Sequence, residues 1–190
     1  LDIAFAAKKK GYDVKIGYGE LGNTKTSILL EKNIECFQVP LVRGSINPIK
    51  ELWSLISILR IFFKLKPEIV HLITIKAYLY GGISARLVKV PAVLSSVAGL
   101  GILFNQKKWW NILIQKLLQP IFYLAFNHPN QRVIVQNTED RKTLTTWAGV
   151  DPKKFLLING SGVNLSKFEN LDNLNDTVTV CFASRLLRDK

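Results

Sequence analysis

Along the chain, short continuous apolar runs alternate with longer segments in which apolar residues recur every three or four positions. The first pattern predicts buried strands, and the second predicts helices that bury one face. Strands are expected at residues 13–18, 34–39, 69–74, 92–97, 132–136, 155–158 and 177–183. Helices are expected at residues 1–10, 23–32, 48–66, 76–89, 107–126 and 138–147, the last capped by Thr138, Glu139 and Asp140. Strands that alternate with helices and are apolar on both faces predict an α/β fold with a Rossmann-like parallel sheet and helices on both faces.

One stretch interrupts this alternation. Residues 160–176 are polar and poor in strand formers, which is typical of a linker between domains. We therefore expect a Rossmann-like first domain over residues 1–165, a linker over 166–176 and the start of a second domain over 177–190. Because the sequence opens on a helix and ends soon after the strand at 177–183, we expect a fold that is truncated at both ends.

The composition is that of a globular protein, with 48% apolar residues, 21% charged residues and no low-complexity tract among the 190 positions. Cys36 and Cys181 both lie in apolar, strand-like runs and are expected to be buried and reduced. Nothing in their spacing indicates a disulfide framework or a zinc site. No basic-then-apolar leader opens the sequence, so we do not expect a signal peptide. These observations favour a cytoplasmic setting.

Positive charge is concentrated in the middle of the chain. Over the whole sequence the formal net charge is +12. Between Cys36 and Thr138 twelve basic residues face only Glu51 and Glu68, and no acid lies between Ile69 and Thr138. Such a stretch is expected to meet a negative partner, which could be nucleic acid, anionic lipid or a phosphorylated substrate.

A glycine motif follows the first expected strand. Gly17, Gly19 and Gly22 match the Gly-x-Gly-x-x-Gly pattern, which lets the backbone approach a dinucleotide pyrophosphate. The pattern also needs an acidic residue at the end of the next strand to hold a ribose. That strand, at 34–39, has no acid at its end, and Glu35 lies at its start. We therefore interpret the motif as an ordinary glycine-rich turn.

The helix at 107–126 has a composition suited to a membrane surface. Its apolar face contains Trp110, Leu113, Ile114, Leu117, Leu118 and Ile121. Indole rings at the headgroup level and lysines on anionic lipid are what an interfacial helix needs, whereas the charges and Pro120 argue against a membrane-spanning helix. The residues expected to contact the membrane are Lys107, Lys108, Trp109, Trp110 and Lys116.

The helix at 48–66 is apolar almost all round. A narrow stripe of Ser54, Ser57, Arg60 and Lys64 interrupts the apolar surface. A helix between two strands of a parallel sheet ordinarily covers that sheet, so packing on the sheet is the favoured interpretation of this helix.

Catalytic arrangements are not visible in the sequence. His71 lies inside an apolar strand and is interpreted as a hydrogen-bonded core histidine, and His128 lies in a turn. No pair of carboxylates, metal-ligand spacing or nucleophile with a base is evident. Arg185 and Lys190 follow the last expected strand, where a guanidinium and an ammonium could neutralise a diphosphate. Taken alone, two basic residues near a chain end usually form a solvated tail.

Four segments, in this order along the chain, carry a family resemblance. They read ITIKAYLYGGISARLVKVPAVLSSVAGLG at 73–101, VIVQNTEDRKTL at 133–144, LLINGSGVNLSKF at 156–168 and ASRLLRDK at 183–190. Together they resemble the family 4 retaining glycosyltransferases, and most of all the bacterial enzymes that extend a lipid-linked oligosaccharide or O-antigen unit. The more specific pieces are GSGV with a Phe five residues on and a strand that leads into Arg-x4-Lys. The alternation of strands and helices is generic to many α/β proteins.

The resemblance implies a GT-B architecture, in which two Rossmann-like domains enclose the active site between them. It implies transfer of a hexosyl or N-acetylhexosaminyl group from a nucleotide-sugar, a UDP-sugar, with retention and without a metal or other cofactor. The acceptor implied is a polyprenyl-diphosphate-linked glycan. An anionic membrane surface is expected as the further partner, no nucleic-acid partner is expected, and the expected setting is cytoplasmic, on the inner face of the plasma membrane.

Residue roles follow from the same resemblance. Arg185 and Lys190 match the pair that holds the donor diphosphate. The loops expected to face the acceptor contain Thr74 and Lys76 after one strand and Gly99 and Gly101 after the next, with Lys76 placed to meet an acceptor phosphate.

Where many family members carry a His-Gly pair, residues 98–101 read Ala-Gly-Leu-Gly, as in the lipid-linked-sugar branch. The family's first strand is expected before Leu1 and its Glu-x7-Glu motif after Lys190. The catalytic residues therefore stay unknown, and these residues alone are expected to be inactive.

Two other classes remain open. A non-catalytic basic α/β module that binds nucleic acid would account for the charge, although the aromatic residues cluster on apolar helix faces instead of interleaving with basic residues on a strand platform. An NAD-dependent dehydrogenase would share the Rossmann layout, but the missing ribose-binding acid argues against it.

Overall fold

The structure is a computed structural model that describes residues 1–19, 23–42, 47–100, 109–160 and 162; for residues 23–26, 109–111 and 113 only the backbone is described. The chain divides into two compact units, Leu1–Gly160 and Ser161–Lys190. The description below concerns the first unit. The strand expected at 177–183 lies outside the described residues, and the expected domain boundaries at 165 and 176 stay predictions.

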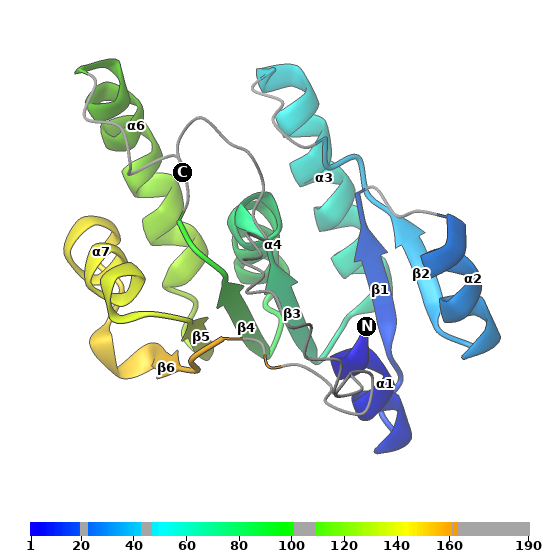
Figure 1. Ribbon diagram of the computed structural model, residues 1–190. Coiled ribbons are helices and arrows are strands. Elements are labelled where there is room, and N and C mark those ends of the chain that lie inside the picture. Colours follow the sequence, from blue (N-terminus) through cyan, green and yellow to red (C-terminus); the bar gives the residue numbers. More distant parts are fainter. Residues whose placement is uncertain (20–22, 43–46, 101–108, 161, 163–190) are drawn as a thin grey trace, which may run out of the picture. The chain divides into compact units, whose positions relative to one another are not determined.

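All described strands pair in parallel (Figure 1). One sheet contains β1 (Lys15–Tyr18) and β2 (Glu35–Gln38). The other has the order β3-β4-β5-β6, formed by β3 (Ile69–Ile73), β4 (Ala92–Val97), β5 (Gln131–Val135) and β6 (Phe155–Leu157). The predicted α/β class with parallel strands is confirmed, with the difference that the strands form two sheets.

Helices connect these strands. They are α1 (Asp2–Lys9), α2 (Asn23–Glu31), α3 (Pro48–Leu65), α4 (Ile75–Val88), α6 (Trp109–Phe126), α7 (Thr138–Ala148) and the short 3-10 helix η1 (Pro152–Lys154). In Figure 1 the helix α4 lies between α3 and α6, and it contacts both of them as well as β3 and β4. The helix α7 packs against α6 and β5.

The boundaries of α3 follow from its sequence. The side chain of Asn47 accepts hydrogen bonds from the backbone N–H groups of Ile49 (3.0 Å) and Lys50 (3.4 Å), and Pro48 occupies the first turn, where a missing N–H costs nothing. At the other end Lys66 adopts a left-handed conformation (φ 45°) directly before Pro67, which cannot continue a helix.

The start of α7 differs from expectation. Thr138, Glu139 and Asp140 were the expected caps, but all three lie inside the helix, and the cap is Asn137, whose side chain accepts from the Asp140 backbone N–H at 2.7 Å. Only a residue with an extended backbone just before the first turn can aim its side-chain oxygen at these N–H groups, and Asn137 has that conformation (φ −150°, ψ 161°).

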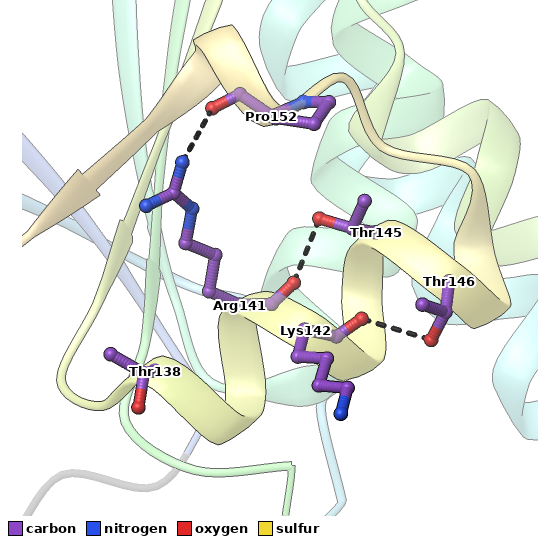
Figure 2. A pocket seen from close by; sticks show the side chains of 6 residues that line it. All are labelled: Thr138, Arg141, Lys142, Thr145, Thr146 and Pro152. Carbon is purple, nitrogen blue, oxygen red and sulfur yellow. Dashed lines mark hydrogen bonds between the residues drawn. The ribbon is translucent and has the colours of Figure 1, made fainter.

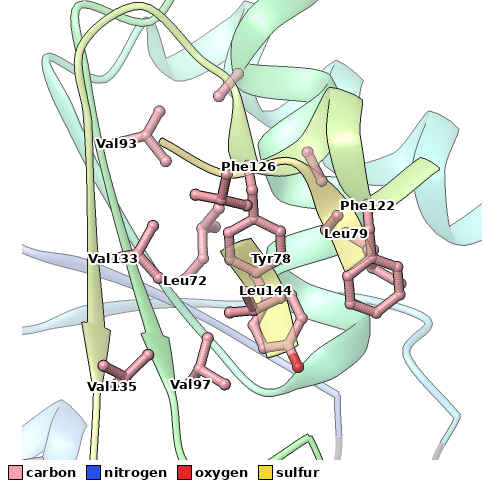
Figure 3. Close-up of a cluster of buried hydrophobic side chains, with 14 of the residues drawn as sticks. Leu72, Tyr78, Leu79, Val93, Val97, Phe122, Phe126, Val133, Val135 and Leu144 are labelled. Carbon is pink, nitrogen blue, oxygen red and sulfur yellow. The ribbon is translucent and has the colours of Figure 1, made fainter. Parts of the chain in front are cut away.

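The core lies between α4, α6, α7 and the four-stranded sheet (Figure 3). The ring centroids of Tyr78 and Phe126 are 5.0 Å apart, and those of Phe122 and Trp147 are 4.9 Å apart. Close approach of α4 and α6 depends on Gly82, because a Cβ there would lie 2.4 Å from the backbone oxygen of Ala125. The four-stranded sheet is thus covered on one face by a tightly packed layer of α4, α6 and α7.

Candidate functional site

The carboxyl ends of β3, β4 and β5 bring three loops to one edge of the sheet. In the strand register Val97 pairs with Val135, and Ile73 pairs with Ser96, one residue earlier in β4. The loops that follow therefore begin next to one another. Ligands of open parallel sheets bind at this edge, so we take it as the candidate site. The predicted site residues Thr74, Lys76 and Gly99 all lie in these loops or just after them, and Gly101 lies outside the described residues.

Thr74 joins β3 to α4 in an unusual conformation. Its backbone has φ 80° and ψ 155°, a region that β-branched residues rarely enter, and its side chain does not cap the helix. Such a conformation costs about 1–3 kcal/mol, and outliers of this kind cluster at ligand sites. Its carbonyl accepts the backbone N–H of Tyr78 at 3.0 Å, so the helix begins immediately after this sharp turn.

Lys76, in the first turn of α4, contacts a carboxylate and a backbone carbonyl from other parts of the chain. Its Nζ lies 2.6 Å from Glu51 Oε1 and donates to the Val42 carbonyl at 2.8 Å. Tyr80 donates its hydroxyl to Glu51 Oε2 at 2.6 Å. The side chains of Lys76 and Glu51 are only 22% and 18% exposed, so water screens their interaction little. In this arrangement Glu51 already balances the charge of Lys76, and the role of Lys76 toward an acceptor phosphate stays a prediction.

The same carboxylate fixes the state of Tyr80. Partial burial, together with the hydrogen bond to Glu51 and its negative charge, raises the pKa of Tyr80. Tyr80 therefore stays a neutral hydrogen-bond donor at physiological pH. Lys76 was predicted from the sequence as a site residue, whereas Glu51 and Tyr80 were not. The one available signal was that Glu51 and Glu68 are the only acids in a long basic stretch.

Asp140 connects the next two loops. It is 9% exposed and accepts from the backbone N–H of Leu100 at 3.3 Å and from the side-chain amide of Asn137 at 2.8 Å. Gly99 precedes Leu100 with φ 103°, a conformation that favours glycine. Asp140 thus fixes the backbone after β4 against the start of α7. Asn137 and Asp140 are positioning residues that the sequence analysis did not recognise as such.

His71 is the hydrogen-bonded histidine that the sequence predicted. Its Nε2 lies 2.7 Å from Ser96 Oγ, which joins β3 to β4. Burial lowers the pKa of His71 below its ordinary value of 6.5, so the neutral imidazole is favoured. We interpret the contact as structural, because no carboxylate is hydrogen-bonded to this ring within the part of the chain that the structure describes.

Figure 2 shows a shallow hollow of about 340 Å³ between α7 and the turn at Pro152. Arg141 contacts the Pro152 carbonyl at 3.5 Å, and Thr145 and Thr146 donate to carbonyls of their own helix, each at 2.9 Å. These polar groups therefore already form hydrogen bonds, either within α7 or to the turn at Pro152. We do not regard the hollow as a catalytic site.

Gly19 of the dinucleotide-like motif has a packing role. A Cβ at Gly19 would lie 2.5 Å from the backbone oxygen of Leu41, so glycine is required by the close approach of the two segments after β1 and β2. The strand β2 ends at Gln38, which supplies no carboxylate. Both observations agree with an ordinary turn; Gly22 lies outside the described residues.

Lys116, on α6, is exposed, as is its neighbour Leu117. The inner face of the helix is formed by Phe122, Ala125 and Phe126. Of the apolar face expected from the sequence, Ile114 and Leu117 are exposed, whereas Leu118 and Ile121 pack against the core. Among the described helices none is long and apolar enough to cross a bilayer.

Other predicted residues fall in parts of the chain that the structure does not describe. Lys107, Lys108, Arg185, Lys190 and Cys181 lie outside the described residues, and of Trp109 and Trp110 only the backbone, in the first turn of α6, is described. Cys36 is half-buried, with its thiol donating to the Ile34 carbonyl at 3.3 Å, and burial raises its pKa. Within the described ranges no group of three potential metal ligands occurs.

Known proteins resemble this chain in fold and in sequence. In solved structures, the chain resembles a glycosyltransferase from Rickettsia africae (TM-score 0.59, 20% identity, 87% of this chain and 39% of that one). It also matches MurG of Acinetobacter baumannii (TM-score 0.43, 16% identity, 87% of this chain and 62% of that one). The Rickettsia structure supports the fold alone.

The sequence comparisons are more specific. UDP-Gal:alpha-D-GlcNAc-diphosphoundecaprenol alpha-1,3-galactosyltransferase of Escherichia coli is 33% identical over 147 residues. The matched region is 77% of this chain but only 36% of the E. coli enzyme. The family model described as "Glycosyl transferase 4-like" matches residues 1–137, which include β1 to β5 and the loops of the candidate site. The chain therefore belongs to the glycosyl transferase 4-like family.

Proposed function

We propose that the protein carrying this chain transfers a sugar from a UDP-sugar to a lipid-linked glycan acceptor, with retention of configuration. The observation that carries the proposal is the 33% identity to an enzyme whose name specifies a UDP-galactose donor and a diphosphoundecaprenol-linked acceptor. An O-antigen or related surface glycan is the product class that such an acceptor serves.

In this proposal the described chain forms the acceptor side. Thr74 and Gly99 lie at the carboxyl edge of the sheet, and Asp140 holds the loop of Gly99 in place. A fixed loop geometry aligns an acceptor hydroxyl with a donor carbon and lowers the entropic cost of their encounter. A glycan linked through a diphosphate would bring its negative charge close to the Lys76 ammonium, which is proposed to attract it.

The donor side is assigned to residues of the second unit. Arg185 and Lys190 are proposed to bind the donor diphosphate, Arg185 through its planar fork and Lys190 as a point charge. Their charge would stabilise the departing nucleoside diphosphate as the bond from its oxygen to the anomeric carbon breaks and the acceptor oxygen, losing its proton, bonds to that carbon, so no metal ion is required in this scheme. The described chain by itself is proposed to be inactive.

The membrane is proposed as a further partner. Lys107, Lys108 and Lys116 would contact anionic lipid and Trp109 and Trp110 would lie at headgroup level, on the inner face of the plasma membrane. Exposure of Lys116 and Leu117 on α6 supports this proposal. We assign the basic excess to lipid and acceptor phosphates and not to nucleic acid.

A transfer assay tests the activity. Full-length protein is incubated with a panel of radiolabelled UDP-sugars and a synthetic GlcNAc-diphosphate-lipid, with and without EDTA. We expect one UDP-sugar to be transferred in both conditions, and the NMR coupling of the new anomeric proton to show retention. Absence of transfer from every nucleotide-sugar tested would refute the activity, and an inverted anomeric centre would refute retention.

A further inference from the structure

The side of α3 that faces away from the core is apolar. Four large hydrophobic side chains are exposed there: Ile49 (78%), Leu52 (58%), Trp53 (54%) and Phe63 (70%). At about 100° per residue, these four fall with Ile56 and Arg60 on an arc of roughly 100°. They therefore form one stripe along the 18-residue helix, which we call the outer stripe of α3.

The opposite side of the helix accounts for its packing in the fold. Ser54 and Ile58 are buried, and Ser54 donates its hydroxyl to the carbonyls of Lys50 (2.9 Å) and Pro40. Ser54 belongs to the narrow polar stripe that interrupts the apolar surface of α3 in the sequence, and polar residues of a helix commonly face water. The structure turns this serine inward instead, because hydrogen bonds satisfy its hydroxyl there. Packing on the fold and an exposed apolar face thus occur together in α3.

The exposed charged side chains that α3 and its C-cap residue contribute on or beside the outer stripe are all positive. Lys50, Arg60, Lys64 and Lys66 are exposed on or beside it. The one acid of the helix, Glu51, points to the inner side and is paired with Lys76. The guanidinium of Arg60 lies 5.6 Å from the ring centre of Trp53, within the range of a cation–π contact. Apolar side chains bordered by unbalanced cations are the features that bind an anionic lipid surface.

The length and place of α3 fit the same partner. Eighteen residues span about 27 Å, enough for the stripe to lie along a bilayer surface. In Figure 1 the helices α3 and α6 lie on the two sides of the shorter α4, and both begin near the carboxyl edge of the strands. A membrane that contacts α3 would therefore also lie close to α6 and to the candidate site.

We propose that the outer stripe of α3 is a membrane-contacting surface, which inserts Leu52, Trp53 and Phe63 among the headgroups of anionic lipids. Arg60 contacts lipid phosphate while it stays over the Trp53 ring. The proposal deepens the membrane association proposed above for α6 and rests on it only for its biological purpose, which is to bring the candidate site to a lipid-linked acceptor.

Vesicle co-sedimentation of the full-length protein tests the proposal. The variant Leu52→Gln/Trp53→Gln/Phe63→Gln removes the stripe without touching a buried residue. Ile3→Gln/Leu87→Gln is the matched control, because these side chains are comparably exposed on α1 and α4. With phosphatidylcholine vesicles that contain phosphatidylglycerol, we expect the stripe variant to bind at least about tenfold more weakly, since three large apolar side chains no longer leave water. The control is expected to bind as the wild type does.

Two outcomes would overturn the proposal. One is unchanged binding of the stripe variant at low and at moderate salt. The other is a wild-type dimer in gel filtration that the variant loses, because the stripe would then be covered by a second copy of the chain.

A transfer assay in detergent separates this proposal from the proposed function. With a short-chain, water-soluble acceptor the stripe variant is expected to keep the wild-type rate, since it lacks only the bilayer contact. If the wild type itself transfers no sugar, the proposed function fails, whereas the difference in vesicle binding still decides the role of α3.

Discussion

Lys76 Nζ lies 2.6 Å from Glu51 Oε1, and this ion pair joins the first turn of α4 to the first turn of α3. The two residues are 25 positions apart in the chain. Their contact fixes the position of α3 next to the loop that follows β3, which is part of the candidate site. It also removes the one acid of α3 from the surface, so the outer stripe of that helix carries only positive charge.

Breaking this pair is expected to destabilise the fold. Glu51→Gln leaves a partly buried ammonium without its counter-charge, and we expect a loss of about 1–2 kcal/mol in the free energy of unfolding, between the values typical of exposed and of buried pairs. Urea denaturation of Glu51→Gln, Lys76→Met and the double variant measures the coupling. Lys15→Met, which breaks the more exposed pair with Glu35, is the control and should have a smaller effect. Strictly additive effects of Glu51→Gln and Lys76→Met would show that the pair is not coupled.

Gly82 is expected to tolerate no side chain. A Cβ at this position would lie 2.4 Å from the backbone oxygen of Ala125, and a backbone atom of a packed helix cannot move aside as a side chain could. We expect Gly82→Ala to cost about 1–3 kcal/mol by forcing α4 and α6 apart. Gly17→Ala is the matched control, since its Cβ would meet Val39 at an ordinary 3.4 Å. Equal melting temperatures for the two variants would contradict the close packing of α4 on α6.

The order of strands and helices could be predicted from the sequence because its physical causes are local. Continuous apolar runs, such as the one at β3, produce strands, and Pro67 and Pro91 end the helices before them. The end of α3 was predicted to within one residue for this reason. The class of sheet followed as well, since helices between successive strands are the long crossover connections that parallel pairing needs.

The contacts at the candidate site could not be predicted, because they depend on distant segments meeting. Thr74 and Gly99 were identified through the family resemblance. The hydrogen bond from the Leu100 N–H to Asp140, however, joins residues 40 positions apart. Asp140 had been assigned to the helix cap, which Asn137 in fact provides. The same limit applies to α3. Its periodicity allowed an apolar face in any direction, and only the packing of Ser54 shows which face is outward.

Substitution of Asn137 by aspartate is expected to destabilise the fold more than the same substitution at an ordinary helix cap. Its side-chain oxygen accepts from the Asp140 N–H, and its amide also donates to Asp140 Oδ2 at 2.8 Å. Asn137→Asp keeps the acceptor but replaces the donor with a second negative charge, so we expect a loss of about 1–2 kcal/mol. Asn47→Asp is the control, because Asn47 caps α3 by accepting the backbone N–H groups of Ile49 and Lys50, which an aspartate accepts equally well, and it should be nearly neutral in thermal unfolding. If both substitutions are neutral, Asn137 acts only as a cap.

Arg185 is expected to contribute to the affinity of the full-length protein for the UDP-sugar donor. Arg185→Ala removes the guanidinium proposed to hold the diphosphate, and loss of a charged hydrogen bond of this kind weakens binding by about 1.5–3 kcal/mol. Isothermal titration calorimetry with UDP measures the change. Arg141→Ala is a suitable control, because Arg141 is engaged with the Pro152 carbonyl on the outer side of α7. Wild-type UDP affinity in Arg185→Ala would remove this residue from the donor site.

His71 is expected to make the stability of the fold depend on pH. Burial lowers the pKa of His71 in the folded chain below its ordinary 6.5, so the unfolded chain binds the proton more readily. The contribution of the neutral ring is therefore complete above pH 6.5 and is lost as the pH falls below that value. His71→Gln can keep a hydrogen bond to Ser96 Oγ but does not titrate, and its melting temperature should fall less between roughly pH 7 and pH 5 than that of the wild type. If the melting temperatures of the two proteins change in parallel over this range, protonation of His71 does not contribute to the pH dependence of stability.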